Sequence, residues 1–169
     1  MTQQQQNNIF EDWLARYKGM FFKVVRVYAF TPADQDDLFQ EIAVQIWRSV
    51  PSFREESSAG TWIYRIALNT AMKWIRKEQK HREGQPYEHL EHLLTTNESL
   101  VDDRLEWLYE EIAHMNEADR AITLLLLDGF SYKEMSDILG ISENHIGVKI
   151  HRIKKHLITK SKNYDHHGV

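Results

Sequence analysis

Apolar residues recur three or four positions apart along most of the chain, which is the spacing of one face of a helix. Over residues 32–49 this face contains Leu38, Ile42 and Ile46. The same periodicity predicts further helices over residues 9–29, 62–80, 104–115 and 116–127. Leu124 to Leu127 is apolar on every side, which indicates a helix buried from several directions. We therefore expect an all-α fold.

The stretch from Ser131 to Leu157 predicts two helices joined by a tight turn. Ser131 can cap the first helix, and Glu134, three residues later, can complete a capping box. Gly140 can adopt the left-handed conformation that ends a helix, and Ser142 can cap the next one. This pattern is typical of a helix-turn-helix.

The second of these helices has two unlike faces. Its apolar side chains recur at steps of four, three and four residues, at Ile146, Ile150, Ile153 and Leu157. The opposite and flanking positions are mostly polar or basic and form a candidate DNA-binding face: Asn144, Gly147, Val148, Lys149, His151, Arg152 and Lys155. Such a helix fits a DNA major groove, where its early residues meet base edges and its cations meet phosphates. An amphipathic helical hairpin with a solvated basic face is the alternative interpretation.

The charge is distributed in blocks, although the net charge is only -4 and the pI about 6.1. Residues 62–82 and 149–162 are basic, whereas residues 83–119 carry many acids and the single base Arg104. This distribution argues against non-specific coating of nucleic acid and favours two separate contact surfaces on a polyanion. The first basic block includes Arg65, Asn69, Lys73 and Arg76 on one helix face, where cations and nearby aromatics could hold phosphates and stack unpaired bases. A solvated basic face is again the alternative.

Composition divides the chain into five segments. Residues 1–8 are low-complexity and expected to be disordered, and residues 9–82 are expected to form an N-terminal helical domain. A flexible acidic linker is expected over residues 83–103. Residues 104–160 are expected to form a helical domain with the helix-turn-helix, followed by a tail over residues 161–169.

No apolar run is long enough to span a membrane, and the N-terminus lacks the pattern of a secretion signal. The absence of cysteine excludes disulfides and thiolate sites and fits a cytoplasmic protein.

Three motifs, taken together and in this order, resemble the extracytoplasmic-function group of bacterial RNA polymerase sigma factors in the sigma-70 family. They are DDLFQEIAVQIW, SFREESSAGTWIYRIALNTAMKWIRK and SYKEMSDILGIS, and the resemblance extends from Phe10 to Leu157. It implies a bacterial, cytoplasmic and non-enzymatic protein without a cofactor. Such a protein binds core RNA polymerase and promoter DNA, directs promoter melting, and has an anti-sigma factor as an inhibitory partner.

The resemblance also implies roles for individual positions. Docking on the polymerase clamp is implied for Asp37, Gln40, Glu41 and Arg48, although the acids near the start of that helix would also complement its dipole. Capture of a flipped base of the −10 element and contacts with the melted strand are implied for Phe53, Ser58, Thr61, Trp62, Arg65, Asn69, Lys73 and Arg76.

Recognition of the −35 element is implied for the exposed face of the helix-turn-helix. There Gly147 and Val148 depart from the basic residue and serine that are frequent in the family, which would shift base readout to Asn144, His151 and Lys155 or to DNA shape.

Other function classes find less support in the sequence. His89 and His92 near Glu91, and His166 and His167, are not arranged as in a metal site. There is no glycine-rich phosphate loop and no nucleophile paired with a base. Two alternatives remain open at this stage: a stand-alone helix-turn-helix regulator that binds duplex DNA without polymerase, and a helical adaptor that binds only protein.

Overall fold

The computed structural model describes residues 1–81 and 102–167. The expected all-α fold is confirmed, because these residues form eight α helices and one short 3-10 helix and include no strand. In chain order the elements are α1 (Gln3–Arg16), α2 (Lys18–Tyr28), α3 (Pro32–Ser49), η1 (Val50–Ser52), α4 (Ala59–His81), α5 (Asp103–His114), α6 (Glu117–Leu127), α7 (Tyr132–Leu139) and α8 (Glu143–His167). The expected acidic linker falls almost entirely outside the described residues.

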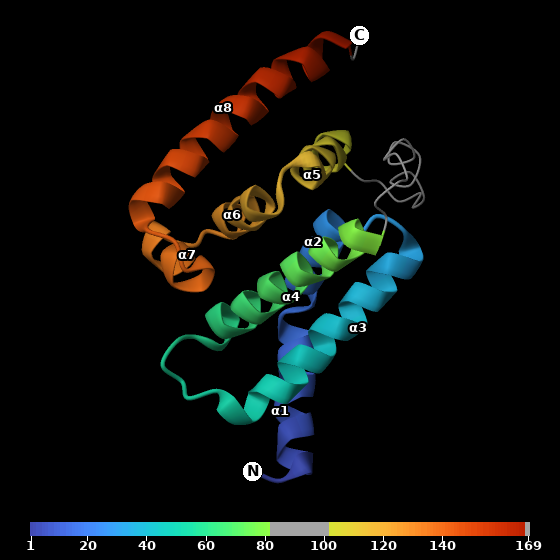
Figure 1. Ribbon diagram of the computed structural model, residues 1–169, viewed down its shortest axis with the longest axis vertical. Coiled ribbons are helices and arrows are strands. Elements are labelled where there is room, and N and C mark those ends of the chain that lie inside the picture. Colours follow the sequence, from blue (N-terminus) through green and yellow to red (C-terminus); the bar gives the residue numbers. More distant parts are fainter. Residues whose placement is uncertain (82–101, 168–169) are drawn as a thin grey trace.

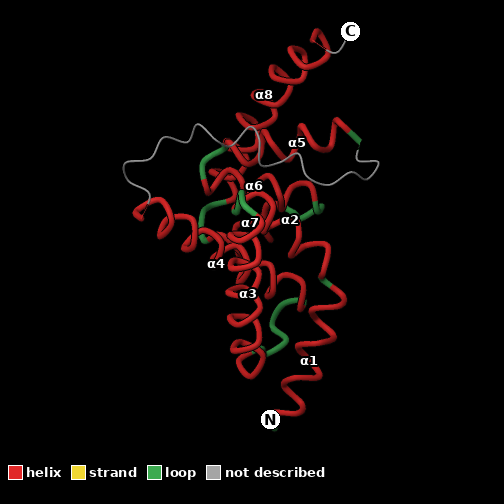
Figure 2. The backbone as a smooth tube through the Cα atoms, turned by 90° about the vertical axis from the view of Figure 1, so that its right-hand side faces the viewer, coloured by secondary structure: helices red, strands yellow, loops and turns green. Residues whose placement is uncertain are grey.

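Helices α1–α4 and α5–α8 form two units that pack against each other. Helix α4 is central, because it contacts α2 and α3 of its own unit and also α6 and α7 of the other, while α2 contacts α5 and α6. The N-terminus and α1 lie at one end of the molecule, and the end of α8 lies at the other (Figures 1 and 2). Among the described residues no helix is both long and apolar enough to cross a membrane.

The N-terminal segment differs from the prediction in two ways. Residues 9–29 do not form one helix, because Tyr17 has φ -105° and ψ 15° and divides the segment into α1 and α2. Residues 3–8, expected to be disordered, form the start of α1 beneath a capping box at Thr2. Their amides are held by Trp47: Gln6 Nε2 donates to its carbonyl at 2.7 Å, and the Trp47 Nε1 donates to Asn7 Oδ1 at 2.8 Å.

The helix starts follow local hydrogen-bonding rules. Thr31 caps α3 through the amide of Asp34, with Pro32 in the first turn of that helix. Helix α4 begins at Ala59, earlier than the start expected at Trp62. The Ser58 Oγ accepts from the Thr61 amide at 3.1 Å and supplies the bond at this helix start. Asn116 caps α6 through the amide of Asp119.

The helix-turn-helix is confirmed in detail. Ser131 and Glu134 form the capping box of α7, and Gly140 ends that helix with φ +70°, in the left-handed region. The Ser142 Oγ accepts from the His145 amide at 3.2 Å, and α8 then continues to His167 rather than ending before a tail at residue 161.

One connected apolar core runs through both units. It contains the isoleucines predicted on the inner face of α8, Ile146, Ile150 and Ile153, with Leu157 half-buried beside them. Of the apolar run in α6, Leu124 and Leu125 are fully buried, but Leu127 is 50% exposed at the end of the helix. Helix α4 is buried on two sides, so that Tyr64, Leu68 and Ala71 belong to the core together with Ile63 and Ala67.

Candidate nucleic-acid interface

The loop before α4 forms a cavity of about 710 Å³. Its wall includes Phe53, Trp62 and Arg65 from the N-terminal unit and Glu134 and Asp137 from α7. The aromatic part is rigid, because the Phe53 ring meets the Trp13 ring edge-on at 5.3 Å and the Trp62 ring at 5.9 Å. A cavity with an aromatic wall and polar residues at its rim can accept a planar base by stacking and hydrogen bonding.

The loop holds its shape through local bonds. Ser58 Oγ lies 2.9 Å from Thr61 Oγ1, and the Trp62 Nε1 donates to Ser49 Oγ at 3.3 Å. Glu55 has φ +58°, a left-handed conformation that costs a non-glycine residue about 1 to 3 kcal/mol and is frequent at binding sites. The loop that the sequence predicts for base capture therefore has a defined conformation.

The predicted strand-contacting residues follow one face of α4. Asn69, Lys73 and Arg76 are exposed, and Arg65 is half-buried. Two of the cations are already paired across the molecule: Arg65 donates to the Asp137 carbonyl, and Arg76 lies 2.6 Å from the Glu117 carboxylate. The hydrogen bond and charge of Glu117 raise the pKa of Arg76.

The same face of α4 borders a second, smaller cavity of about 280 Å³ against the C-terminal unit. It is lined by Asn69, Met72, Lys73 and Arg76 on one side and by Ala118, Ile122, Leu139 and Ile141 on the other. The sequence could not indicate this arrangement, because the two sides lie more than forty residues apart in the chain.

The residues expected to bind polymerase share the outer face of α3. Asp37, Gln40, Glu41 and Arg48 are all exposed, and the Gln45 amide donates to Glu41 Oε1 at 2.9 Å. The sequence-based set omits Val44, which lies within this polar face and is 43% exposed. Its position between Glu41 and Arg48 at helical spacing was a signal that could have identified it.

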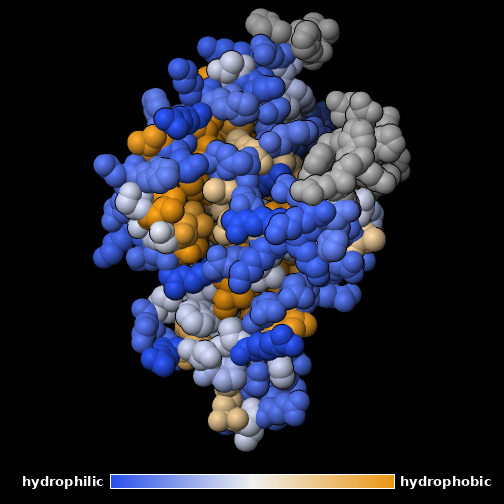
Figure 3. Space-filling model, in the orientation of Figure 1, coloured by the Kyte–Doolittle hydropathy of each residue, from blue (hydrophilic) through white to orange (hydrophobic). Residues whose placement is uncertain are grey.

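The exposed face of α8 presents five of the seven residues expected there: Asn144, Val148, His151, Arg152 and Lys155. Gly147 is half-buried under the Tyr132 ring, since a Cβ added at this glycine would lie 3.4 Å from Tyr132 Cε2. Tyr132, Gly147, Val148 and His151 line one shallow cavity of about 530 Å³. Tyr132 from α7 therefore lies on the candidate DNA-binding face. The sequence-based set omits it, because that set contains residues of α8 only. Figure 3 shows apolar side chains around α7 on an otherwise largely hydrophilic surface.

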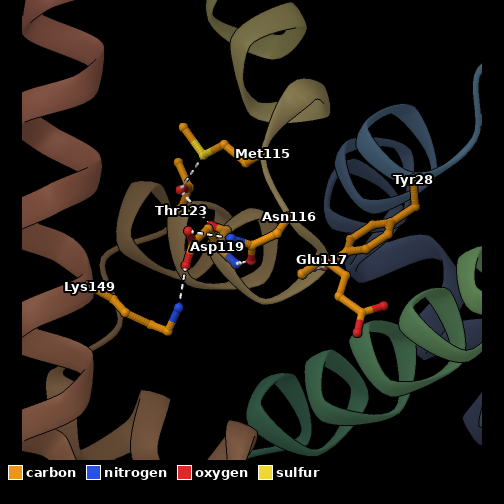
Figure 4. A network of polar contacts seen from close by, with 7 residues as sticks. All are labelled: Tyr28, Met115, Asn116, Glu117, Asp119, Thr123 and Lys149. Atoms are coloured by element: carbon orange, nitrogen blue, oxygen red, sulfur yellow. Dashed lines mark hydrogen bonds and ion pairs between the residues drawn. The ribbon is translucent and has the colours of Figure 1, made fainter. Parts of the chain in front are cut away.

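Lys149 differs from the rest of the predicted set. Its Nζ lies 2.8 Å from Asp119 Oδ1, so it points from α8 back toward α6 (Figure 4). Asp119 also accepts from the Asn116 amide group at 2.7 Å, within the network that starts α6. In this conformation Lys149 joins two helices of the C-terminal unit and is not directed at a ligand.

Within residues 1–81 and 102–167, no group of three or more His, Cys, Asp or Glu side chains is placed to hold a metal ion. His89 and His92 lie outside the described residues.

Two family models match the chain, one for each unit. Residues 13–81 match sigma-70 region 2, and residues 105–157 match sigma-70 region 4. The loop, α3 and α4 lie in the first match, and the helix-turn-helix lies in the second.

Full-length relatives extend this similarity. The ECF RNA polymerase sigma-E factor of Haemophilus influenzae is 27% identical over 172 residues, covering 94% of this chain and 90% of the relative. The RNA polymerase sigma factor YlaC of Bacillus subtilis is 28% identical over 143 residues, covering 75% and 78%.

Two solved structures share the fold. The sigma factor RpoE from Bartonella quintana, in complex with the anti-sigma factor NepR, superposes with a TM-score of 0.70 at 19% identity, covering 90% of this chain and 96% of that one. CnrH, in complex with the cytosolic domain of CnrY, gives a TM-score of 0.66 at 19% identity, covering 93% and 90%.

Proposed function

The chain belongs to the extracytoplasmic-function group of the sigma-70 family, and from this premise we propose how its surfaces divide the work of transcription initiation. It is an alternative sigma factor that directs core RNA polymerase to promoters. Its role is regulatory and not that of a catalyst. We assign promoter opening to the N-terminal unit and upstream promoter recognition to the helix-turn-helix.

We assign capture of one base of the −10 element to the loop cavity. The aromatic wall from Phe53 and Trp62 supports this assignment, because stacking on these rings replaces part of the stacking that a base loses when it leaves the duplex. The melted strand then follows α4, where Asn69 and Lys73 are exposed and Arg65 and Arg76 carry guanidinium groups suited to phosphates. Ser58 and Thr61 contact the strand at the mouth of the cavity.

We assign polymerase docking to the outer face of α3. Asp37, Gln40, Glu41 and Arg48 supply the polar contacts, and Val44 supplies an apolar anchor between them. A central apolar side chain within a polar rim is the usual organisation of a protein interface.

We assign the −35 element to the exposed face of α8. Asn144, His151 and Arg152 offer hydrogen bonds to base edges, and Val148 offers an apolar contact for a thymine methyl group. Lys155 lies farther along the helix and suits a phosphate. Tyr132 joins this face beside Gly147.

The observation that carries the proposal is the combination of two elements in one chain. A cavity of about 710 Å³ with an aromatic wall, next to an exposed cationic helix, is formed mainly by the part that matches region 2, and a helix-turn-helix lies in the part that matches region 4. A stand-alone regulator would need only the second. We also propose an anti-sigma factor as a partner, because both solved relatives are named in complex with another protein, described for one as an anti-sigma factor.

Lys73 provides the test of the strand assignment. Arg76 is less suitable, because its replacement would also remove the ion pair with Glu117. We expect Lys73→Glu to reduce open-complex formation with core polymerase about tenfold, the loss expected for one charged hydrogen bond, while polymerase binding stays unchanged. The measurement is the fluorescence of 2-aminopurine placed in the −10 element.

The matched control is Lys18→Glu, an equal charge change at an exposed lysine on α2. Normal melting by Lys73→Glu, or an equal loss in both variants, would refute the strand-contact role of α4.

A further inference from the structure

Helix α1 contacts the loop before α4 on both sides of its exposed part. At the start of the loop, the buried Trp13 ring meets the Phe53 ring edge-on at 5.3 Å. At the end of the loop, Tyr17, the residue that ends α1, lies against Gly60, since a Cβ added to this glycine would lie 3.2 Å from Tyr17 Cε1. The exposed residues 54–58 lie between these two contacts. One helix therefore holds both ends of the loop that the proposed function gives to base capture.

The first turns of α1 also hold the end of α3, through Trp47. The Gln6 amide group donates to the Trp47 carbonyl at 2.7 Å, and the Trp47 Nε1 donates to Asn7 Oδ1 at 2.8 Å. The Trp47 carbonyl also accepts from the Val50 amide, where α3 passes into η1. Both views place the start of α1 beside the end of α3 (Figures 1 and 2). Gln6 and Asn7 therefore fix the point from which the chain enters the loop.

Further contacts connect the end of α3 with the aromatic wall of the cavity. The Ser49 hydroxyl donates to the Ile46 carbonyl at 2.8 Å, and its Oγ accepts from the Trp62 Nε1 at 3.3 Å. The Trp62 ring in turn lies 5.9 Å from the Phe53 ring. The end of α3 is thus bound to α1 on one side and to the aromatic wall on the other, so a loss of the α1 contacts would loosen both rings.

The loop needs this support, because Glu55 has a left-handed backbone. A non-glycine residue keeps such a strained conformation only where the surrounding structure over-determines it. The bond between Ser58 and Thr61 holds the end of the loop, and the packing of Phe53 on α1 holds its start. A loop that is ordered beforehand loses less conformational entropy when a base enters the cavity, so it binds the base more tightly.

We propose that α1 is a brace that positions the base-capture loop, with Gln6 and Asn7 as positioning residues that act through Trp47. The brace keeps the aromatic wall in place and so raises the affinity of the cavity for a flipped base. Gln6 and Asn7 precede Trp13, where the match to sigma-70 region 2 begins, so that match assigns no role to them. The inference rests on the proposed capture of a −10 base by the cavity.

Gln6→Glu tests the brace, because a carboxylate has no hydrogen to donate to the Trp47 carbonyl. The Phe53 amide, which donates to the Val50 carbonyl at 3.2 Å, should then exchange its hydrogen for deuterium about fivefold faster, the effect expected for one lost hydrogen bond. Mass spectrometry of peptides from the full chain measures this exchange. Exchange in α8 should stay unchanged, whereas general destabilisation would raise it in both places.

The matched control is Gln4→Glu, the same substitution two positions earlier in α1. The Gln4 amide group donates to Asn8 Oδ1 at 2.9 Å within the helix, so the loop should exchange as in wild type. Two variants of Asn7 separate the hydrogen bond from the packing. Asn7→Asp keeps an acceptor for the Trp47 Nε1 and should match wild type, whereas Asn7→Leu removes the acceptor and should loosen the loop as Gln6→Glu does.

Promoter opening tests whether the brace acts through the cavity. With core polymerase and 2-aminopurine in the −10 element, Gln6→Glu should reduce open-complex formation about fivefold, and Phe53→Ala, which removes one ring of the wall, about tenfold. The double variant should lose no more than Phe53→Ala alone, because the brace has no effect once the wall that it positions is gone. Independent destabilisation would instead multiply the two losses.

Wild-type exchange of the Phe53 amide in Gln6→Glu would overturn the proposal. Multiplied losses in the double variant would overturn it as well, and so would a looser loop with normal promoter opening where Phe53→Ala is defective. Failure of the proposed function gives a different result: Phe53→Ala itself would open the promoter normally, although the loop would still exchange faster in Gln6→Glu.

Discussion

Two glycines of the helix-turn-helix show how the backbone decides the role of a residue. Gly140 has φ +70°, a conformation that side chains resist, whereas Gly147 lies inside α8, where an alanine is compatible with the backbone. The nearest atom to a Cβ at Gly147 is Tyr132 Cε2 at 3.4 Å, and Tyr132 is exposed and able to move slightly. The same change of glycine to alanine should therefore have opposite effects at the two positions.

We expect Gly147→Ala to raise the free energy of unfolding by about 0.5 to 1 kcal/mol, because alanine is the better helix former and restricts the unfolded chain. Gly140→Ala should lower it by about 1 to 2 kcal/mol, because the left-handed conformation is strained for alanine. Urea unfolding followed by circular dichroism measures both. Destabilisation by Gly147→Ala would mean that contact with Tyr132 outweighs helix propensity.

For single residues, helical periodicity predicts from the sequence which side chains are buried. It does not predict contacts between residues that are distant in the chain. Ile146, Ile150 and Ile153 are buried as expected, because helical spacing alone places them on one face. Lys149 was grouped with the exposed cations, yet it pairs with Asp119, thirty residues earlier in the chain. No local pattern could identify that partner.

Helix starts were predictable in the helix-turn-helix, where a serine next to each helix supplies the bond. Ser131 and Ser142 accept backbone amides of the helices that the sequence assigns to them. The break at Tyr17 was not predictable, because no proline or polar cap marks it and the apolar spacing continues across it. The helix at residues 3–8 depends on Trp47, a partner about forty residues away.

The capping box of α7 should have a pH signature. The backbone amide of Ser131, and secondly its hydroxyl, lower the pKa of Glu134. A pKa that is lower in the folded state than in the unfolded state contributes stability above the unfolded value of about 4.3, and that stability is lost as the pH falls through the folded value. We therefore expect wild type to lose stability relative to Glu134→Gln as the pH falls from about 5 to about 3. Urea unfolding at each pH provides the comparison, and a constant difference would contradict the role of the ionised carboxylate.

The outer face of α3 gives a prediction about a whole helix. Asp37→Lys combined with Glu41→Lys should weaken the complex with core polymerase about tenfold or more, as expected when charged interface contacts become repulsive. Fluorescence anisotropy of labelled protein titrated with core polymerase measures the affinity. Glu11→Lys, an exposed acid on α1, is the control with a charge change of the same sign. Unchanged affinity of the α3 variant would exclude this face as the docking surface.

At the scale of the molecule, the sequence predicts two helical units but not their contact. The surfaces that meet are formed by residues such as Lys23 and Asp128, which are separated by more than a hundred positions. Each unit contains its own sequence motifs, so each unit can be identified without information from the other. The packing of one on the other determines which proposed DNA contacts are accessible, and only the structure contains that information.

The central claim is that this chain gives core RNA polymerase a promoter specificity of its own. The most direct measurement is transcription in vitro from fragmented genomic DNA of the source bacterium, with purified core polymerase, with and without the protein, and with sequencing of the transcript ends. We expect new start sites that require the protein and share sequence elements near positions −10 and −35. If no start site depends on the protein although it binds a duplex site by itself, the claim is contradicted and a stand-alone regulator becomes the better account.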